Sequence, residues 1–181
     1  MGGSFFIIKQ YEYAILILKK FLEEPDGWIE NKLNSCLVLS CCYQAMGENA
    51  AAFDILFYSF TMDVPRAEIC CEIGRLFMEK KEYVTAAYWY QQAFLAPRKK
   101  KNGGFYIADS HDFIPAIQMC VCLDKAGRHR EAFEFHKKAR VLKPLHQAVI
   151  GNEKYFWDVW GMSERENSPV LLVFHILIVN I

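Results

Sequence analysis

The sequence has no excess of charge of either sign. Its 181 residues contain 21 Lys and Arg against 21 Asp and Glu, which gives a formal net charge of zero. Proteins that bind nucleic acid usually carry a basic surplus on one face, so we expect no nucleic-acid partner. The short basic run Arg98–Lys101 is interpreted as a solvated loop.

Signals for membranes, secretion and nucleotides are also missing. The apolar stretch Pro169–Ile181 is too short to cross a bilayer, because a spanning helix takes about 20 residues. The N-terminus has neither the basic start nor the cleavage site of a secretory signal, and no Gly-x-x-x-x-Gly-Lys loop is present. We therefore expect a cytoplasmic protein without a membrane span and without a cofactor.

The seven cysteines include no Cys-x-x-Cys pair. Their odd number and their spacing suit neither a disulfide framework nor tetrahedral zinc. We interpret them as small apolar residues packed between helices, and we expect no metal. The alternative is a metal site built from Cys120, Cys122 and His111.

An internal repeat is present. When the segment Ala67–Phe94 is shifted back by 34 residues it lies over Leu33–Phe60, and shifted forward by 46 residues it lies over Phe113–Arg140. The shifts superpose residues of related size: Gly74 on Ser40 and Cys120, Phe77 on Tyr43 and Leu123, Ala86 on Ala52 and Ala132, Tyr90 on Leu56 and His136, and Ala93 on Ser59 and Ala139.

This pattern predicts a stack of helical hairpins. One hairpin cannot bury its apolar face alone, so neighbouring hairpins must cover it. Small residues such as Gly74 and Ala86 allow close helix contact, and large ones such as Phe77 fill the space between layers. Gly47 and Gly127 tolerate the left-handed conformation that ends a helix.

The 34-residue period, Gly74 with Phe77, and Ala86, Tyr90 and Ala93 resemble the tetratricopeptide repeat. The resemblance implies an all-α solenoid of antiparallel helical hairpins, a right-handed superhelix with about three and a half repeats. It divides the chain into a repeat domain and an apolar tail: half repeat 10–25, repeats 33–66, 67–97 and 113–146, capping helix 147–156, and tail 157–181. An insertion between the second and third repeats, containing Gly103 and Gly104, is expected to be a mobile loop.

A narrower resemblance rests on several short words, namely Arg66–Gly74, Trp89-Tyr90, Phe113–Pro115 with Gln118–Lys125, Asn152–Phe156 and Trp28–Glu30. Together they resemble the C-terminal repeat region of bacterial family 2 glycosyltransferases, over roughly residues 10 to 156. In that family a separate N-terminal domain does the chemistry with a nucleotide-sugar and a divalent metal.

The chain departs from this family in lacking the catalytic domain and its Asp-x-Asp metal motif. Ser110–Asp112 stands where such sequences often have Cys-Trp-Gly. The resemblance therefore implies a non-catalytic module for protein–protein interaction and assembly, and we expect the chain by itself not to be an enzyme. The alternative is a stand-alone adaptor that binds a peptide.

The first helices of the repeats are expected to line a concave groove that binds a protein or peptide. Helical spacing places eleven candidate residues on this face: Asn34, Leu37, Cys41, Gln44, Glu68, Cys71, Arg75, Met78, Ile117, Val121 and Asp124. The face is mixed and apolar, which favours an amphipathic helix or another domain as occupant. The competing interpretation is that part of the face is buried against neighbouring segments.

None of the five histidines stands at a recognisable spacing from a nucleophile. His136 falls on a core position of the third repeat, so we expect it to be buried with its hydrogen bonds satisfied. Asp112 is expected to cap the helix that begins at Phe113 or Ile114, with Pro115 in its first turn.

Self-association is the last expectation. The predicted helix Tyr11–Leu22 is apolar nearly all round, and Trp157, Trp160 and the tail are apolar at the other end. Exposed apolar patches of this size usually mark interfaces. We expect a homodimer, or an oligomer built through one terminus, with the N-terminal half repeat as the favoured contact.

Overall fold

The computed structural model describes residues 2–98 and 106–161, with side chains from residue 8 onward. Within this part the chain forms eight α-helices and no strand: α1 Gly2–Glu23, α2 Ile29–Ala45, α3 Asn49–Tyr58, α4 Ala67–Glu79, α5 Tyr83–Leu95, α6 Phe113–Lys125, α7 His129–Leu142 and α8 Gln147–Trp160. Two short 3-10 helices, η1 Ser59–Thr61 and η2 Ala108–His111, lie in the connections.

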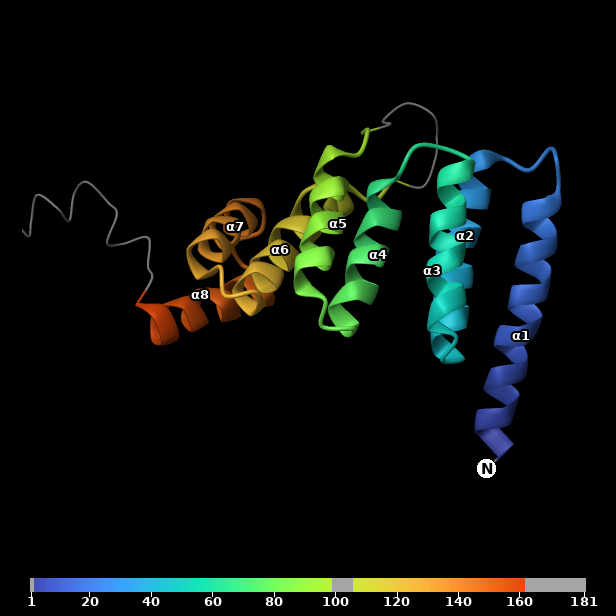
Figure 1. The fold of residues 1–181 in the computed structure, drawn as a ribbon, viewed down its shortest axis with the longest axis horizontal. Coiled ribbons are helices and arrows are strands. Elements are labelled where there is room, and N and C mark those ends of the chain that lie inside the picture. Colours follow the sequence, from blue (N-terminus) through green and yellow to red (C-terminus); the bar gives the residue numbers. More distant parts are fainter. Residues whose placement is uncertain (1, 99–105, 162–181) are drawn as a thin grey trace, which may run out of the picture.

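The helices follow one another as an elongated array of hairpins (Figure 1). Six α-helices in three pairs, α2 with α3, α4 with α5 and α6 with α7, account for the span that the repeat predicted. The all-α solenoid is therefore confirmed. The helices extend beyond the predicted boundaries at three places: α1 begins at Gly2, ahead of residue 10, α2 begins at Ile29, ahead of residue 33, and α8 continues past residue 156 to Trp160.

The three hairpin corners have the same backbone geometry. The peptide N–H of Glu48 donates to the Tyr43 carbonyl at 2.8 Å, and Glu82 and Arg128 donate in the same way to Phe77 and Leu123. This 6→1 bond ends a helix around a residue with positive φ. That residue is Gly47, Lys81 or Gly127, with φ of 79°, 62° and 79°. Shifts of 34 and 46 residues superpose these three positions too.

Replacing Lys81 with glycine is expected to stabilise the protein by about 0.5–1 kcal/mol, because the left-handed conformation strains any side chain with a Cβ. The equivalent positions already have glycine, and a Cβ at Gly127 would meet no other atom within 4 Å. The reciprocal change Gly127→Lys isolates this backbone term and is expected to destabilise by about 1 kcal/mol. Urea denaturation of both variants measures the two shifts, and a less stable Lys81→Gly protein would contradict the assignment.

Small residues stand where helices approach closely. Ala52, Ala86 and Ala132 are fully buried, as is Ser40. A Cβ added to Gly74 would lie 3.0 Å from the Tyr90 ring. The small positions of the repeat are thus set by contact between the two helices of a hairpin.

The core is divided among the layers. Its largest cluster contains residues of α4, α5, α6 and α7, together with Phe156 of α8. Between the first and second repeats the contact is aromatic: the Trp89 ring lies 5.5 Å from Phe57 and 5.9 Å from Phe60, centroid to centroid. At the N-terminal end, α1 packs on α2 through Leu22, which contacts Cys36 and Leu39.

No helix among residues 2–98 and 106–161 has both the length and the apolar character that crossing a bilayer requires. Most of the predicted apolar tail, from residue 162 onward, lies outside the described residues, as does the 99–105 part of the expected mobile loop.

Candidate functional site

All eleven predicted groove residues lie on the first helices α2, α4 and α6. Their exposure varies widely. Cys41 is exposed, Cys71 and Ile117 are buried, and the others are half-buried: Asn34, Leu37, Gln44, Glu68, Arg75, Met78, Val121 and Asp124. Their part in partner binding stays a prediction, but their contacts within the chain divide the face into three regions.

The first region is a polar network between α2 and α4. The Gln44 amide donates to Glu72 Oε1 at 2.9 Å, and Arg75 Nε donates to Glu72 Oε2 at 2.9 Å. Arg75 also donates to the side-chain amide oxygen of Gln44 and to the Glu79 carboxylate. Burial alone would raise the pKa of Glu72, but the bonds from Arg75 and Gln44 hold it below its ordinary value. The network joins the first two repeats and keeps Glu72 ionised.

The second region is a small hollow of about 40 Å³ on the same face. Asn34, Leu37 and Glu68 line it together with the ion pair Glu30–Arg66. The ion pair measures 2.5 Å between Arg66 Nη2 and Glu30 Oε1, and both side chains are largely buried. Sequence reasoning did not single out Glu30 or Glu72, because their partners Arg66 and Gln44 are 36 and 28 residues away on helices that only the fold brings together.

The chain itself covers part of this face. The segment leading into the third repeat crosses α4: the Ile107 N–H donates to Glu68 Oε1 at 2.8 Å, and the Cys71 thiol donates to the Ser110 carbonyl at 3.4 Å. The interpretation that neighbouring segments bury part of the face therefore holds for Cys71 and Glu68. The face stays open farther along α2, where Val38 is 40% exposed and Cys41 is exposed.

The third region belongs to α8. Asp124 accepts a hydrogen bond from the Tyr155 hydroxyl at 2.9 Å and lies 2.8 Å from His129 Nδ1. The Trp160 indole N–H donates to Tyr155, and its ring stacks on His129 at 3.7 Å. Asp124 thus holds the last helix against α6 and α7, a use that the repeat pattern did not indicate.

The cysteines lie mostly at buried positions. Six of the seven are buried, Cys41 being the exception. Burial raises the pKa of the Cys120 and Cys122 thiols to about 12, so both stay protonated at neutral pH. Cys120 Sγ accepts from Asn152 at 3.5 Å, and no group of three or more His, Cys, Asp or Glu in the described part of the chain is arranged to hold a metal ion.

His136 lies in apolar surroundings. His136 is buried between Phe133 and Phe156 as expected, but its Nδ1 has no hydrogen-bond partner within the described residues. The expectation that its hydrogen bonds are satisfied was therefore wrong for this atom. Burial lowers the pKa of His136, so a neutral imidazole fits the apolar site.

The helix cap at Asp112 is confirmed. Its carboxylate accepts from the Phe113 N–H at 2.6 Å, and α6 begins at Phe113. The neighbouring His111 is buried and stacks on Tyr106, with ring centroids 4.9 Å apart. Asp112 therefore has a structural role at the start of α6.

The described residues thus define an all-α, tetratricopeptide-like solenoid. Among solved structures the chain is similar to MamA, a protein of tetratricopeptide-like fold, with a TM-score of 0.55 and 22% sequence identity over 74% of this chain and 69% of that one. Neither the protein-family models nor the curated proteins give a match. At this identity the similarity establishes the fold alone.

Proposed function

We propose that this chain is a protein–protein interaction and assembly module that binds partners along its first-helix face. The observation that carries the proposal is the open surface between α2 and α4. There Val38, Cys41 and Met78 offer apolar contact beside the fixed network of Gln44, Glu72 and Arg75. A preformed surface with ordered polar groups binds at lower entropic cost than a flexible one.

The charges on this surface favour a basic partner. Glu72 and Glu79 lie on the open part of α4, and Arg75 is the one Lys or Arg within that helix. Complementary charge speeds association and excludes wrong partners. We therefore propose an amphipathic helix whose polar side carries Lys and Arg as the occupant.

Binding of labelled amphipathic peptides tests this proposal. A peptide with a basic polar side is expected to bind at least about tenfold more tightly than one with an acidic polar side and the same apolar side. Val38→Lys is expected to weaken that binding at least about tenfold by placing a charge in the contact. Val141→Lys, at an 83% exposed position on α7, is the matched control and should leave affinity unchanged. Equal binding of both peptides, or no effect of Val38→Lys, argues against this surface.

The finer proposal is that the module forms the non-catalytic C-terminal repeat region of a glycosyltransferase-like protein. The short segments between residues 10 and 156 that resemble the repeat region of those enzymes support it. A glycosyltransferase domain encoded directly upstream in the genome would favour this parent protein, and an unrelated upstream gene would favour the stand-alone peptide-binding adaptor. Cytoplasmic location is part of either proposal.

We further propose that the chain alone is not an enzyme. The buried, protonated thiols and the structural roles of Asp112 and Asp124 support this, because none of these groups is free for acid–base or nucleophilic chemistry. Incubation of the isolated chain with nucleotide-sugars is the test. Hydrolysis or sugar transfer by this chain would overturn the proposal.

A further inference from the structure

The second helices of the first two repeats form a surface almost without charge. Helix α5 contains no Lys, Arg, Asp or Glu, and α3 contains only Asp54. The repeat fold does not require an uncharged second helix. The matching helix α7 carries six charged residues: Arg130, Glu131, Glu134, Lys137, Lys138 and Arg140. The composition is therefore particular to α3 and α5.

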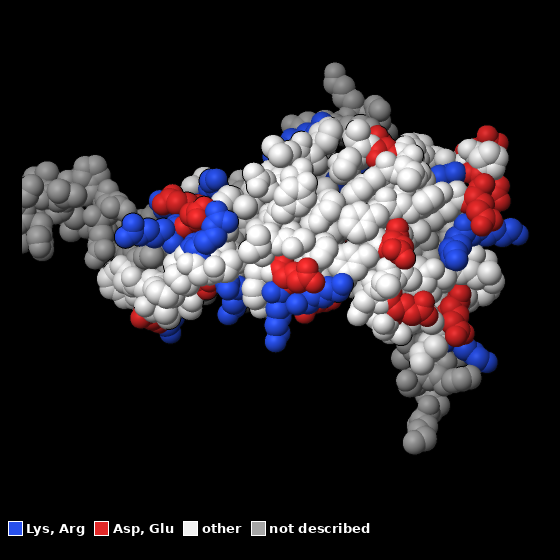
Figure 2. All heavy atoms as spheres, viewed as in Figure 1, with Lys and Arg blue, Asp and Glu red and all other residues white. Residues whose placement is uncertain are grey.

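Large apolar side chains are exposed on this surface, which we name the α3/α5 face. It comprises Phe57, Tyr58, Val64, Val84, Tyr88 and Leu95, with Val84 at 68% and Leu95 at 70% exposure. Figure 2 shows a broad area free of charged atoms over the upper middle of the molecule, with charged groups toward its two ends and along its lower edge.

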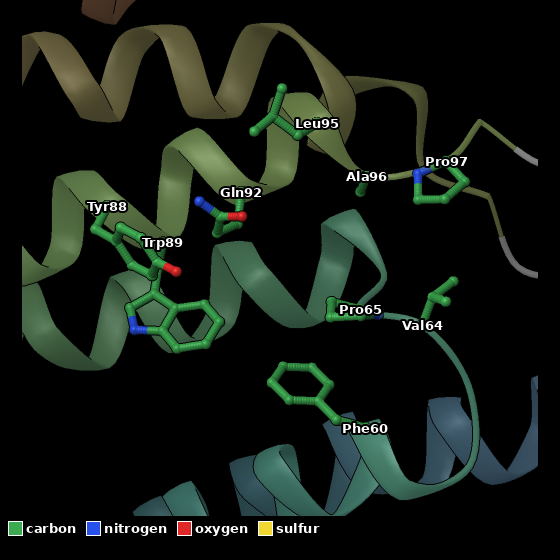
Figure 3. A pocket seen from close by; sticks show the side chains of 9 residues that line it. All are labelled: Phe60, Val64, Pro65, Tyr88, Trp89, Gln92, Leu95, Ala96 and Pro97. Atoms are coloured by element: carbon green, nitrogen blue, oxygen red, sulfur yellow. The ribbon is translucent and has the colours of Figure 1, made fainter.

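A hollow of about 300 Å³ opens in this face. In Figure 3, Trp89, Gln92 and Leu95 of α5 lie on one side of it, and Phe60, Val64 and Pro65 of the α3–α4 connection lie on the other. None of its lining residues is charged. The hollow is wide enough for apolar side chains of another chain to enter.

We propose that the α3/α5 face is the contact surface between two copies of this chain, related by a two-fold axis. This proposal rests on the assembly function proposed above and names one partner for it. In a two-fold contact the same patch faces itself. When an uncharged patch packs against its own copy, no like charges repel and no unpaired ion is buried. The charged face of α7 would meet both of these costs in a contact with its own copy.

The exposed area is of the right size. A large side chain has about 150–250 Å² of surface, and with exposed fractions of 38% to 70% the six residues expose on the order of 600 Å². A stable dimer buries about 800 Å² per partner, which the half-buried Phe60 and Trp89 and the rim help to supply. The rim carries both signs, Asp54 on α3 and Lys80 at the α4–α5 corner, so a copy can meet opposite charge at the edge.

The α3/α5 face is better suited to self-contact than α1. Helix α1 also exposes Tyr13, Leu16 and Ile17, but Lys9 and Lys20 lie on the same side of the helix. Two copies joined there would place charged residues inside the contact. The α3/α5 face has no such cations within its apolar area.

Sedimentation velocity of the full chain at micromolar concentrations tests the proposal. The unaltered chain is expected to be a dimer. Val84→Glu and Leu95→Glu, both at well-exposed positions, are each expected to raise the dimer dissociation constant at least about tenfold, because the two-fold axis brings two added carboxylates into one contact. Val141→Glu on α7 is the matched control, and circular dichroism verifies that each variant is folded.

Three results would overturn the proposal: a chain that stays monomeric through this range, dimers unaffected by Val84→Glu and Leu95→Glu, or dimers broken by Leu16→Glu on α1 instead. Peptide binding to the first-helix face, measured in the same variants, separates this outcome from failure of the proposed function. If the chain is monomeric but still binds the basic peptide, the dimer proposal is wrong and the proposed function stands.

Discussion

Replacing Tyr90 with alanine is expected to lower the free energy of unfolding by about 3–5 kcal/mol, the loss typical of a large aromatic side chain removed from a core. The side chain is 1% exposed and lies in the largest core cluster. Its neighbours include Gly74, Ala86 and Cys70, which are too small to fill the cavity. Chemical denaturation followed by circular dichroism measures the change.

Two variants control for this prediction. Tyr90→Phe keeps the ring and removes a hydroxyl whose partner is the Met78 sulfur at 3.5 Å, a weak acceptor, so it is expected to cost less than about 1 kcal/mol. Tyr13→Ala makes the same deletion at a 67% exposed position of α1 and should change stability little. A loss below about 1 kcal/mol for Tyr90→Ala would mean that Tyr90 does not support the hairpin contact.

Replacing Arg66 with methionine is expected to cost about 3 kcal/mol, because breaking a buried ion pair leaves an uncompensated charge. Arg66 bonds to Glu30 at 2.5 Å and to Asp63 at 2.8 Å, and Glu30 is only 7% exposed. The pair joins the first turn of α2 to the start of α4. Its loss therefore acts on the junction between the first two repeats.

A double variant distinguishes the loss of the charge pair from the loss of side-chain packing. Glu30→Gln combined with Arg66→Met is expected to be more stable than Arg66→Met alone, since the buried carboxylate is gone. Arg128→Met removes an exposed ion pair with Glu131 and should leave the denaturation midpoint unchanged. If Arg66→Met behaves like Arg128→Met, the pair does not stabilise the junction.

The hairpins could be predicted from the sequence because repeat spacing reports contacts within one hairpin. Gly74 opposite Tyr90, and the corners at Gly47, Lys81 and Gly127, depend on residues close together in the chain. The same steric demand recurs in each repeat, so it leaves the same residue sizes at the same interval. The capping of α6 by Asp112 is local in the same sense.

The groove could be predicted only in outline. Helical periodicity placed the eleven residues on the first helices, but it carries no information on what covers them. Glu68 and Cys71 meet Ile107 and Ser110, 39 residues later in the chain. Asp124 accepts a hydrogen bond from Tyr155, 31 residues away. Contacts at such separations depend on how the connecting segments turn, and no short-range pattern records that.

The sequence by itself thus determined the class of fold, the register of the repeats and the hairpin corners, since each of these follows from sterics and hydrogen bonding between near neighbours. Only the tertiary structure decided which part of the first-helix face stays open, that Arg66 is buried with Glu30, and that the uncharged surfaces of α3 and α5 lie together around one hollow. The reason is physical: burial and charge pairing across layers are properties of the packed array, in which residues distant in the chain exclude water from one another.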